Sequence, residues 1–166
     1  TATMAGDATY NPVTSAASTF TFNKANQTLS FATTSYSLSY GQSQTVLASG
    51  TGTGVVTYSV GSSTACSVSG ASVTITSGTG TCTVNATIAS DFYYNSADSS
   101  NSVSITVAKS DQSITFNSLT NKTLGTGTFT ISATATSGLT VAFTSATTSV
   151  CTISTATVTL VSAGTC

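Results

Sequence analysis

Apolar and hydroxyl-bearing residues alternate along much of the chain. Residues 56–60 read VTYSV and residues 103–106 read VSIT, so that every second side chain is apolar. A period of two places alternate side chains on opposite faces of a strand, and it therefore predicts strands with one buried face. No apolar run has the length of about 18 residues that a membrane-spanning helix needs.

The alternating segments are short and are separated by turns that contain glycine. We expect seven or eight strands in the central part of the chain. They are Gln27–Phe31, Ser37–Tyr40, Thr45–Ser49, Val55–Val60, Ala65–Val68, Ser72–Ile75, Thr81–Ile88 and Ser102–Val107. Their number and their hairpin-like spacing predict an all-β protein, with two antiparallel sheets packed as a sandwich of the immunoglobulin type.

One segment of the chain occurs twice. Residues 24–31 read KANQTLSF, and residues 109–116, roughly 85 positions later, read KSDQSITF. We call this spacing the repeat shift. At nearly the same spacing, Cys66 corresponds to Cys151, Cys82 to Cys166, and Asp7, Tyr10 and Asn11 to Asp91, Tyr94 and Asn95.

The repeat shift predicts the domain organisation. We expect residues 1–26 to be the C-terminal part of one repeat, residues 27–111 to be a complete repeat, and residues 112–166 to be the N-terminal part of a third. Because both ends lie at the same phase of the repeat, we expect an internal segment of a longer polypeptide. The alternative is a subunit whose incomplete ends complete each other between chains.

Charged residues are almost absent, which narrows the classes of function. The chain has three Lys or Arg, four Asp or Glu, no His and no Trp. Strong nucleic-acid binding is not expected, since little positive charge could replace the counterions of phosphate. We expect no enzyme, no cofactor and no metal site, because acid–base catalysis would depend on four aspartates and the tyrosines. The single proline and the apolar periodicity argue against a disordered, mucin-like stalk.

The four cysteines allow three pairings, of which the repeat favours two local bridges. These are Cys66 with Cys82 and Cys151 with Cys166. Each pair encloses a hairpin-like stretch and ends in the sequence Gly-Thr-Cys. Disulfides are typical of an oxidising compartment outside the cytoplasm, so an extracellular or cell-surface location is expected. Free buried cysteines are the alternative, and a zinc site is disfavoured because CxxC and His are lacking.

The order of these motifs resembles that of the tandem bacterial Ig-like repeats of large surface and secreted adhesin-type proteins. The motifs are Lys-x-Asx-Gln-Ser/Thr-Leu/Ile-x-Phe, Cys-x-Val/Ile-Ser, Val-Thr-Ile/Leu, Gly-Thr-Cys and Asp-x-x-Tyr-Asn. The resemblance covers the whole chain. It implies stalks, spacers and fibre shafts more than binding heads, and it does not indicate a ligand.

Three features could carry chemistry beyond packing. Phe92, Tyr93 and Tyr94 could form a loop contact for a sugar, although Tyr94 corresponds to Tyr10, which favours a structural corner with its hydroxyl bonded to the backbone. The other two are a calcium site and an isopeptide bond. We prefer a solvated loop to the calcium site, and a solvated lysine in the hinge to the isopeptide bond. The residues concerned are Asp91, Asn95, Ser96, Asp98 and Asp111 for calcium, and Lys24 and Lys109 for the isopeptide bond.

The leading hypothesis is therefore an extracellular structural repeat that forms a stalk or filament shaft. The expected partners are neighbouring repeats of the same chain or identical subunits, with lateral self-assembly through uncharged strand edges. The runner-up is an adhesin module that recognises a glycan or a cell surface through its loops. N-glycosylation at the N-x-T sequences of Asn26, Asn85 and Asn121 is left open.

Overall fold

The computed structural model describes all 166 residues, Thr1–Cys166, and is entirely β. It divides into two compact units, Thr1–Lys109 and Ser110–Cys166, each described by itself below. It contains several antiparallel sheets and is consistent with a β-sandwich, whereas the domain boundaries predicted from the repeat remain predictions. No helix suited to crossing a membrane is present.

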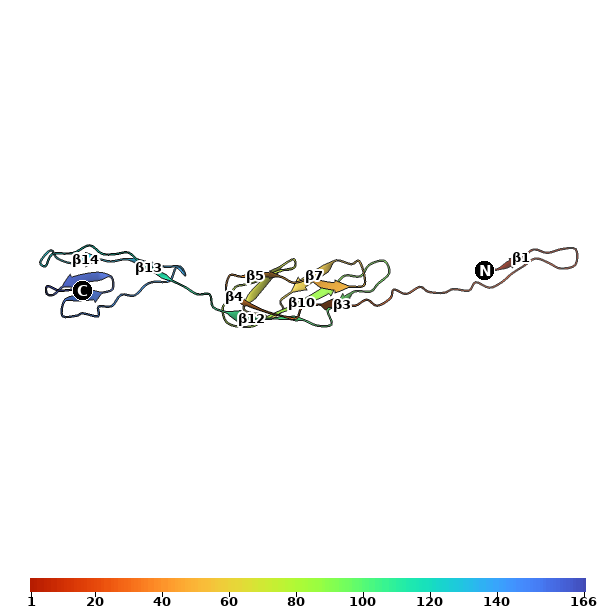
Figure 1. Ribbon diagram of the computed structural model, residues 1–166. Helices are drawn as coiled ribbons and strands as arrows, with labels where there is room; N and C mark the ends of the chain where they lie inside the picture. Colours follow the sequence, from red (N-terminus) through yellow and green to blue (C-terminus); the bar gives the residue numbers. More distant parts are fainter. The chain divides into compact units, whose positions relative to one another are not determined.

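The strands follow one another closely along the chain. In the first unit they are β1 (Thr3–Met4), β2 (Val13–Thr14), β3 (Leu29–Phe31), β4 (Ser35–Ser39), β5 (Ser43–Thr45), β6 (Ala48–Gly50), β7 (Val56–Ser59), β8 (Cys66–Ser69), β9 (Ser72–Ile75), β10 (Cys82–Ile88), β11 (Ala97–Asp98) and β12 (Val103–Ala108). In the second unit they are β13 (Ile114–Phe116), β14 (Phe129–Thr130), β15 (Ala133–Ala135), β16 (Cys151–Ser154) and β17 (Thr157–Leu160). Figure 1 labels many of them.

Residues 27–109, which we call the central domain, contain three hydrogen-bonded sheets, which we sort into two groups. In one group, β3 pairs with β6, and β5, β9 and β8 pair in that order. In the other, β10 pairs with β7, with β11 and with β12, and β12 pairs in parallel with β4. All the other pairings are antiparallel, as hairpin connections favour.

Side chains from both groups meet in one core. Along β10, Cys82, Val84, Ala86 and Ile88 are all buried, as the alternating sequence predicts. They pack in one cluster with buried residues of the other group and of β12. The side chain of Asn101 also links the groups, because its amide accepts a hydrogen bond from the Phe31 amide and donates one to the Phe31 carbonyl, at 2.8 and 2.9 Å.

The predicted strands all have counterparts, with two differences. The segment Thr45–Ser49, predicted as one strand, is divided into β5 and β6, because the chain changes its partner from β9 to β3 around the buried Val46. The two-residue strand β11 was not predicted, because so short a segment has no recognisable period. Both differences arise from pairing with distant strands and not from local sequence.

The second unit repeats the strand register of the central domain. Leu29 faces Gly50 in β3–β6, and Ile114 faces Ala135 in β13–β15, at the repeat shift. The β8–β9 hairpin is likewise repeated by β16–β17. Even the backbone of the turn recurs, since Gly70 has a φ of 56° and Thr155, at the equivalent position, has a φ of 58°. Thr155 is the only residue other than glycine with a positive φ.

Candidate functional site

The loop of residues 91–95, here called the Asp91 loop, is a largely exposed segment of the central domain that several hydrogen bonds hold. Its shape is set by the carboxylate of Asp91, which bonds in two directions. Oδ1 accepts hydrogen bonds from the amides of Tyr93 and Tyr94, each at 2.8 Å, which closes a tight turn. Oδ2 accepts hydrogen bonds from the amide and the hydroxyl of Thr53, at 2.7 and 3.1 Å.

These donors stabilise the ionised form of Asp91. The Thr53 amide is the largest cause, and the amides of Tyr94 and Tyr93 add to it, while partial desolvation acts in the opposite direction. Together they lower the pKa of Asp91 from 3.8 to about 2. The loop is therefore held by a charged group at neutral pH.

The segment that enters the central domain is fastened to the same loop. The Lys24 ammonium donates to the carbonyl of Asp91 at 2.5 Å, and Ala25 exchanges backbone hydrogen bonds with Tyr93 and Asn95 at 2.8 and 2.9 Å. The buried side chain of Gln27 donates to two further carbonyls of this region. Residues 24–27 are thus attached to the Asp91 loop by both backbone and side chains.

The three aromatic residues of the loop do not form one cluster. Phe92 and Tyr93 are 84% and 70% exposed and form an edge-to-face pair with ring centroids 4.9 Å apart. Tyr94 is half-buried and forms an isolated parallel bridge with Ala25. The expected bond from the Tyr94 hydroxyl to the backbone is not formed. This expectation was wrong because the backbone of Tyr94, and not its hydroxyl, makes the anchoring contacts.

The N-terminal segment contains the same turn. Asp7 Oδ1 accepts hydrogen bonds from the amides of Thr9 and Tyr10, each at 2.8 Å, and the Asp7 amide donates to the Tyr10 carbonyl. These donors also lower the pKa of Asp7, the amide of Thr9 being the first cause. Ala8 and Thr9 stand where Phe92 and Tyr93 stand in the central domain. The turn is therefore common to both copies, and the exposed aromatic pair is not.

The aspartates considered for calcium do not converge on one point. The Asp98 carboxylate accepts a hydrogen bond from the Thr87 hydroxyl at 2.7 Å across the β10–β11 pair, while Asp91 is already bonded to four donors. The structure has no group of three or more His, Cys, Asp or Glu side chains that could hold a metal ion. The ammonium of Lys24, considered for an isopeptide bond, contacts a backbone carbonyl.

Two disulfides are formed, with the pairing that the repeat favours. Cys66 and Cys82 are both buried and join β8 to β10, so this bridge links the two groups of strands of the central domain. Cys151 and Cys166 form the second bridge, with Cα atoms 5.7 Å apart. Two disulfides in one chain are typical of an oxidising, extracellular-type environment.

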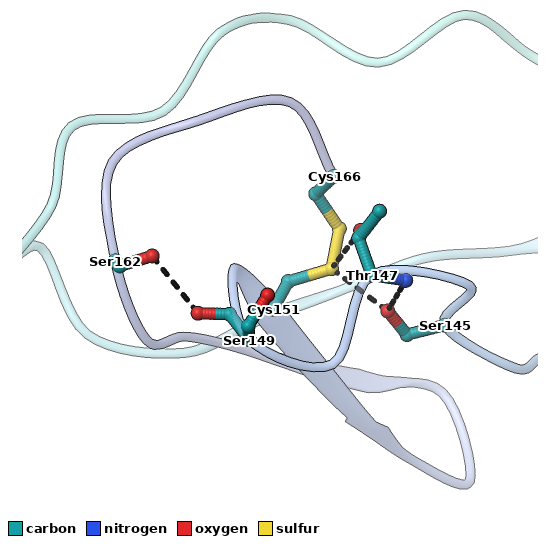
Figure 2. The surroundings of a disulfide bond; sticks show 6 residues. All are labelled: Ser145, Thr147, Ser149, Cys151, Ser162 and Cys166. Carbon is teal, nitrogen blue, oxygen red and sulfur yellow. Dashed lines mark hydrogen bonds between the residues drawn. A yellow bond between two sulfur atoms is a disulfide. The ribbon is translucent and has the colours of Figure 1, made fainter.

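The surroundings of the second disulfide are rich in hydroxyl groups (Figure 2). The Ser145 and Thr147 hydroxyl oxygens lie 3.1 and 3.8 Å from Sγ of Cys151, and the Ser162 hydroxyl donates to the Ser149 carbonyl at 2.8 Å. Cys151 itself is fully buried beneath them. The bridge therefore closes a folded loop that local hydrogen bonds also support.

Comparison with protein-family models, with characterised proteins and with solved structures finds no match to the chain.

Proposed function

We propose that the chain is an extracellular structural repeat, part of a stalk or filament shaft of a bacterial surface protein. In this proposal, Ig-like domains follow one another along the chain, and each is fastened by one internal disulfide. The repeated strand register carries the proposal, because Leu29–Gly50 and Ile114–Ala135 are equivalent pairs one repeat shift apart. The motif order that resembles bacterial Ig-like repeats also supports it.

The pairing pattern of the central domain also supports an Ig-like assignment. Two groups of strands share one core, and β12 lies between β10 and the parallel strand β4 at the margin of its group. The disulfide between β8 and β10 differs from that of antibody domains, which lies between other strands and packs on a tryptophan. This chain has no tryptophan.

A shaft needs joints that bend little and a fold that survives outside the cell. Lys24 and Ala25 are bonded to the Asp91 loop, which restrains the chain where it enters the central domain. The disulfide between Cys66 and Cys82 opposes separation of the two groups of strands. Few charges also leave the strand edges without repulsion, so we propose lateral association of shafts as well.

Immuno-electron microscopy with an antibody raised against the folded central domain tests the proposal. A shaft made of such repeats should be labelled on the cell surface at several points along each fibre. Labelling at one terminal point only would favour a binding head, and labelling confined to the cell interior would contradict the proposal.

The exposed pair Phe92 and Tyr93 favours a second candidate, a module that binds a glycan or a cell surface. Aromatic faces stack on sugars, and the Asp91 turn fixes this pair in place. A glycan array would compare the chain with a Phe92→Ala/Tyr93→Ala variant. Binding that this variant loses supports the second candidate, and absence of binding by the unmodified chain contradicts it.

A further inference from the structure

A strand near the start of the central domain, β4, lies beside the last strand of the domain, β12. The two pair in parallel, from Ser35 with Ser104 to Ser39 with Ala108. Figure 1 shows the chain entering this domain at the end where β3 begins and leaving it at the opposite end, where β12 stops. A pull along the chain therefore acts on β4 through its start and on β12 through its end.

The parallel direction decides how such a pull loads the hydrogen bonds. In a parallel pair the two starts are neighbours, and so are the two ends. Tension then draws β4 and β12 in opposite directions along their common axis, and all the bonds between them are loaded together in shear. If the two strands were antiparallel, the same pull would separate neighbouring ends and open the bonds one after another. Simultaneous loading gives the higher barrier, and the rate over that barrier governs forced unfolding.

The backbone groups that join this pair follow from two hydrogen bonds at its ends. The Ser104 amide donates to the Thr34 carbonyl, and the Tyr40 amide donates to the Ala108 carbonyl, each at 2.8 Å. Alternate residues of a strand turn their backbone groups to the same neighbour, so those of Thr106 also face β4. The Thr106 side chain is exposed. This residue therefore contributes to the sheared pair through its backbone.

The chain ahead of β4 is fastened as well. We call residues 24–39 the entry segment. Its residue Ala25 is bonded to the Asp91 loop, and its strand β3 pairs with β6. Between β3 and β4, the side chain of Asn101 bonds both the amide and the carbonyl of Phe31. Because Asn101 lies just before β12, it ties the entry segment to the start of that strand.

The other side of β12 is joined to the rest of the domain. Cys82 of β10 faces Ile105 of β12, and its disulfide connects it to Cys66 of β8. Apolar side chains of β4 and β12, those of Leu38 and Val107 among them, pack on the core and shield one face of the pair from water. Whichever of the two strands is withdrawn first, the bonds between β4 and β12 must break.

We propose that the central domain resists tension along the chain, and that the sheared pair of β4 and β12 is the element that sets this resistance. The entry segment passes the pull to this pair, and Asn101 acts as a positioning residue between β3 and β12. The biological use of the resistance rests on the proposed shaft function. The resistance itself is a property of the central domain, so it can be measured whether or not the chain forms a shaft.

Single-molecule force spectroscopy of the oxidised full chain, pulled through its two ends at a fixed force, tests the proposal. The step of the central domain is identified by its length. Replacing Cys66 and Cys82 by Ala releases a loop with a sequence separation of 16 and should lengthen this step by about 50 Å. Thr106→Pro removes an amide of the sheared pair and should raise the unfolding rate about tenfold or more. Asn101→Ala should raise it less.

The matched control is Val73→Ala, which leaves a cavity in the same core on β9, a strand that pairs with neither β4 nor β12. Urea denaturation measures how much overall stability each variant loses. For the same loss of stability, Val73→Ala should raise the unfolding rate under force much less than Thr106→Pro. If the two variants fall on one line, the resistance follows overall stability and the proposal is wrong.

The direction of pulling is the decisive measurement, because it needs no destabilised variant. Attachment at Thr33 and Ser100, two exposed residues that precede β4 and β12, pulls neighbouring ends apart. The same bonds then open one after another, and unfolding at the same force should be about tenfold faster or more than with pulling through the chain ends. Equal rates in the two directions overturn the proposal. Equal rates together with labelling along surface fibres would reject the sheared pair and leave the shaft function standing.

Discussion

Phe31 and Phe116 hold the same position in two copies of one strand pair, but Phe31 is 4% exposed and Phe116 is 50% exposed. Their aromatic neighbours are also equivalent. Phe31 lies 6.2 Å from Tyr58 and Phe116 lies 5.6 Å from Phe143, measured between ring centroids. The local contact is thus repeated, while the exposure of the two side chains differs.

The difference in exposure predicts different costs for equivalent substitutions. Leu29→Ala should lower the free energy of unfolding of the central domain by about 2–5 kcal/mol, since it leaves a cavity in a closed core. Ile114→Ala should cost less than about 0.5 kcal/mol, because its side chain is already solvated. Urea denaturation at low protein concentration measures both. Equal costs would contradict the difference in burial.

The disulfide between Cys66 and Cys82 should stabilise the central domain strongly. Replacing both residues by Ala should lower the free energy of unfolding by about 3 kcal/mol in the chain-entropy model, for a sequence separation of 16 residues. This corresponds to a decrease in Tm of roughly 12–24 °C for a domain of this size. Scanning calorimetry of the two forms gives the shift.

The control for that experiment is the second bridge. Cys151→Ala with Cys166→Ala lies outside the central domain and should leave its transition where it was. An unchanged transition after loss of Cys66 and Cys82 would show that their bridge does not contribute to stability.

The Asp91 turn predicts a dependence of stability on pH. The pKa of Asp91 in the folded state is about 2, below the ordinary value of 3.8. The ionised carboxylate therefore contributes its full stabilisation of the folded state at pH values above about 3.8. This contribution should be lost as pH falls from about 4 towards 2. An Asp91→Asn variant should show a flatter decline across this window. Chemical denaturation at several pH values measures it.

NMR titration of the aspartate side chains supplies the control for the pH prediction. Asp91 should titrate well below the ordinary range, because the amide of Thr53 and the amides of Tyr93 and Tyr94 donate to its carboxylate. A Thr53→Pro variant, which lacks the amide donor, should raise this pKa. If Asp91 titrates near 3.8 in the unmodified chain, the turn does not form as described.

The turns at Gly70 and Thr155 allow a matched test of backbone strain. Both residues are in the left-handed region, which costs a β-branched residue roughly 1–2 kcal/mol. Gly70→Thr should therefore destabilise the central domain by about that amount, and urea denaturation measures it. A Gly70→Ala variant should cost less than Gly70→Thr, whereas equal stability of all three forms would contradict the left-handed turn.

Much of the local structure could be predicted from the chain. The period of two marked nearly every strand of the central domain, since alternate burial leaves a direct trace in sequence. The repeat indicated the cysteine pairs, because equivalent residues at one spacing recur as equivalent contacts. The turn at Asp91 was visible as a repeated Asp-x-x-Tyr-Asn, although its hydrogen bonds were not.

The contacts of the candidate site could not be read in the same way. Thr53 and Lys24 are distant from Asp91 along the chain, and only folding brings their donors to its carboxylate and its carbonyl. No sequence signal marked Thr53. Tyr94 was correctly separated from Phe92 and Tyr93 by its repeat partner, but the atoms that anchor it were misjudged.

The sequence by itself indicated most strands of the central domain and the spacing of the repeats, because these depend on side-chain alternation and on equivalent residues that recur. The tertiary structure decided which of them have a partner. Residues 120–124 and 141–144 are the counterparts of β4 and β7, yet they form no strand, whereas β4 and β7 are completed by pairing with β12 and β10. A strand is completed by hydrogen bonds from another strand, and no local pattern can supply them.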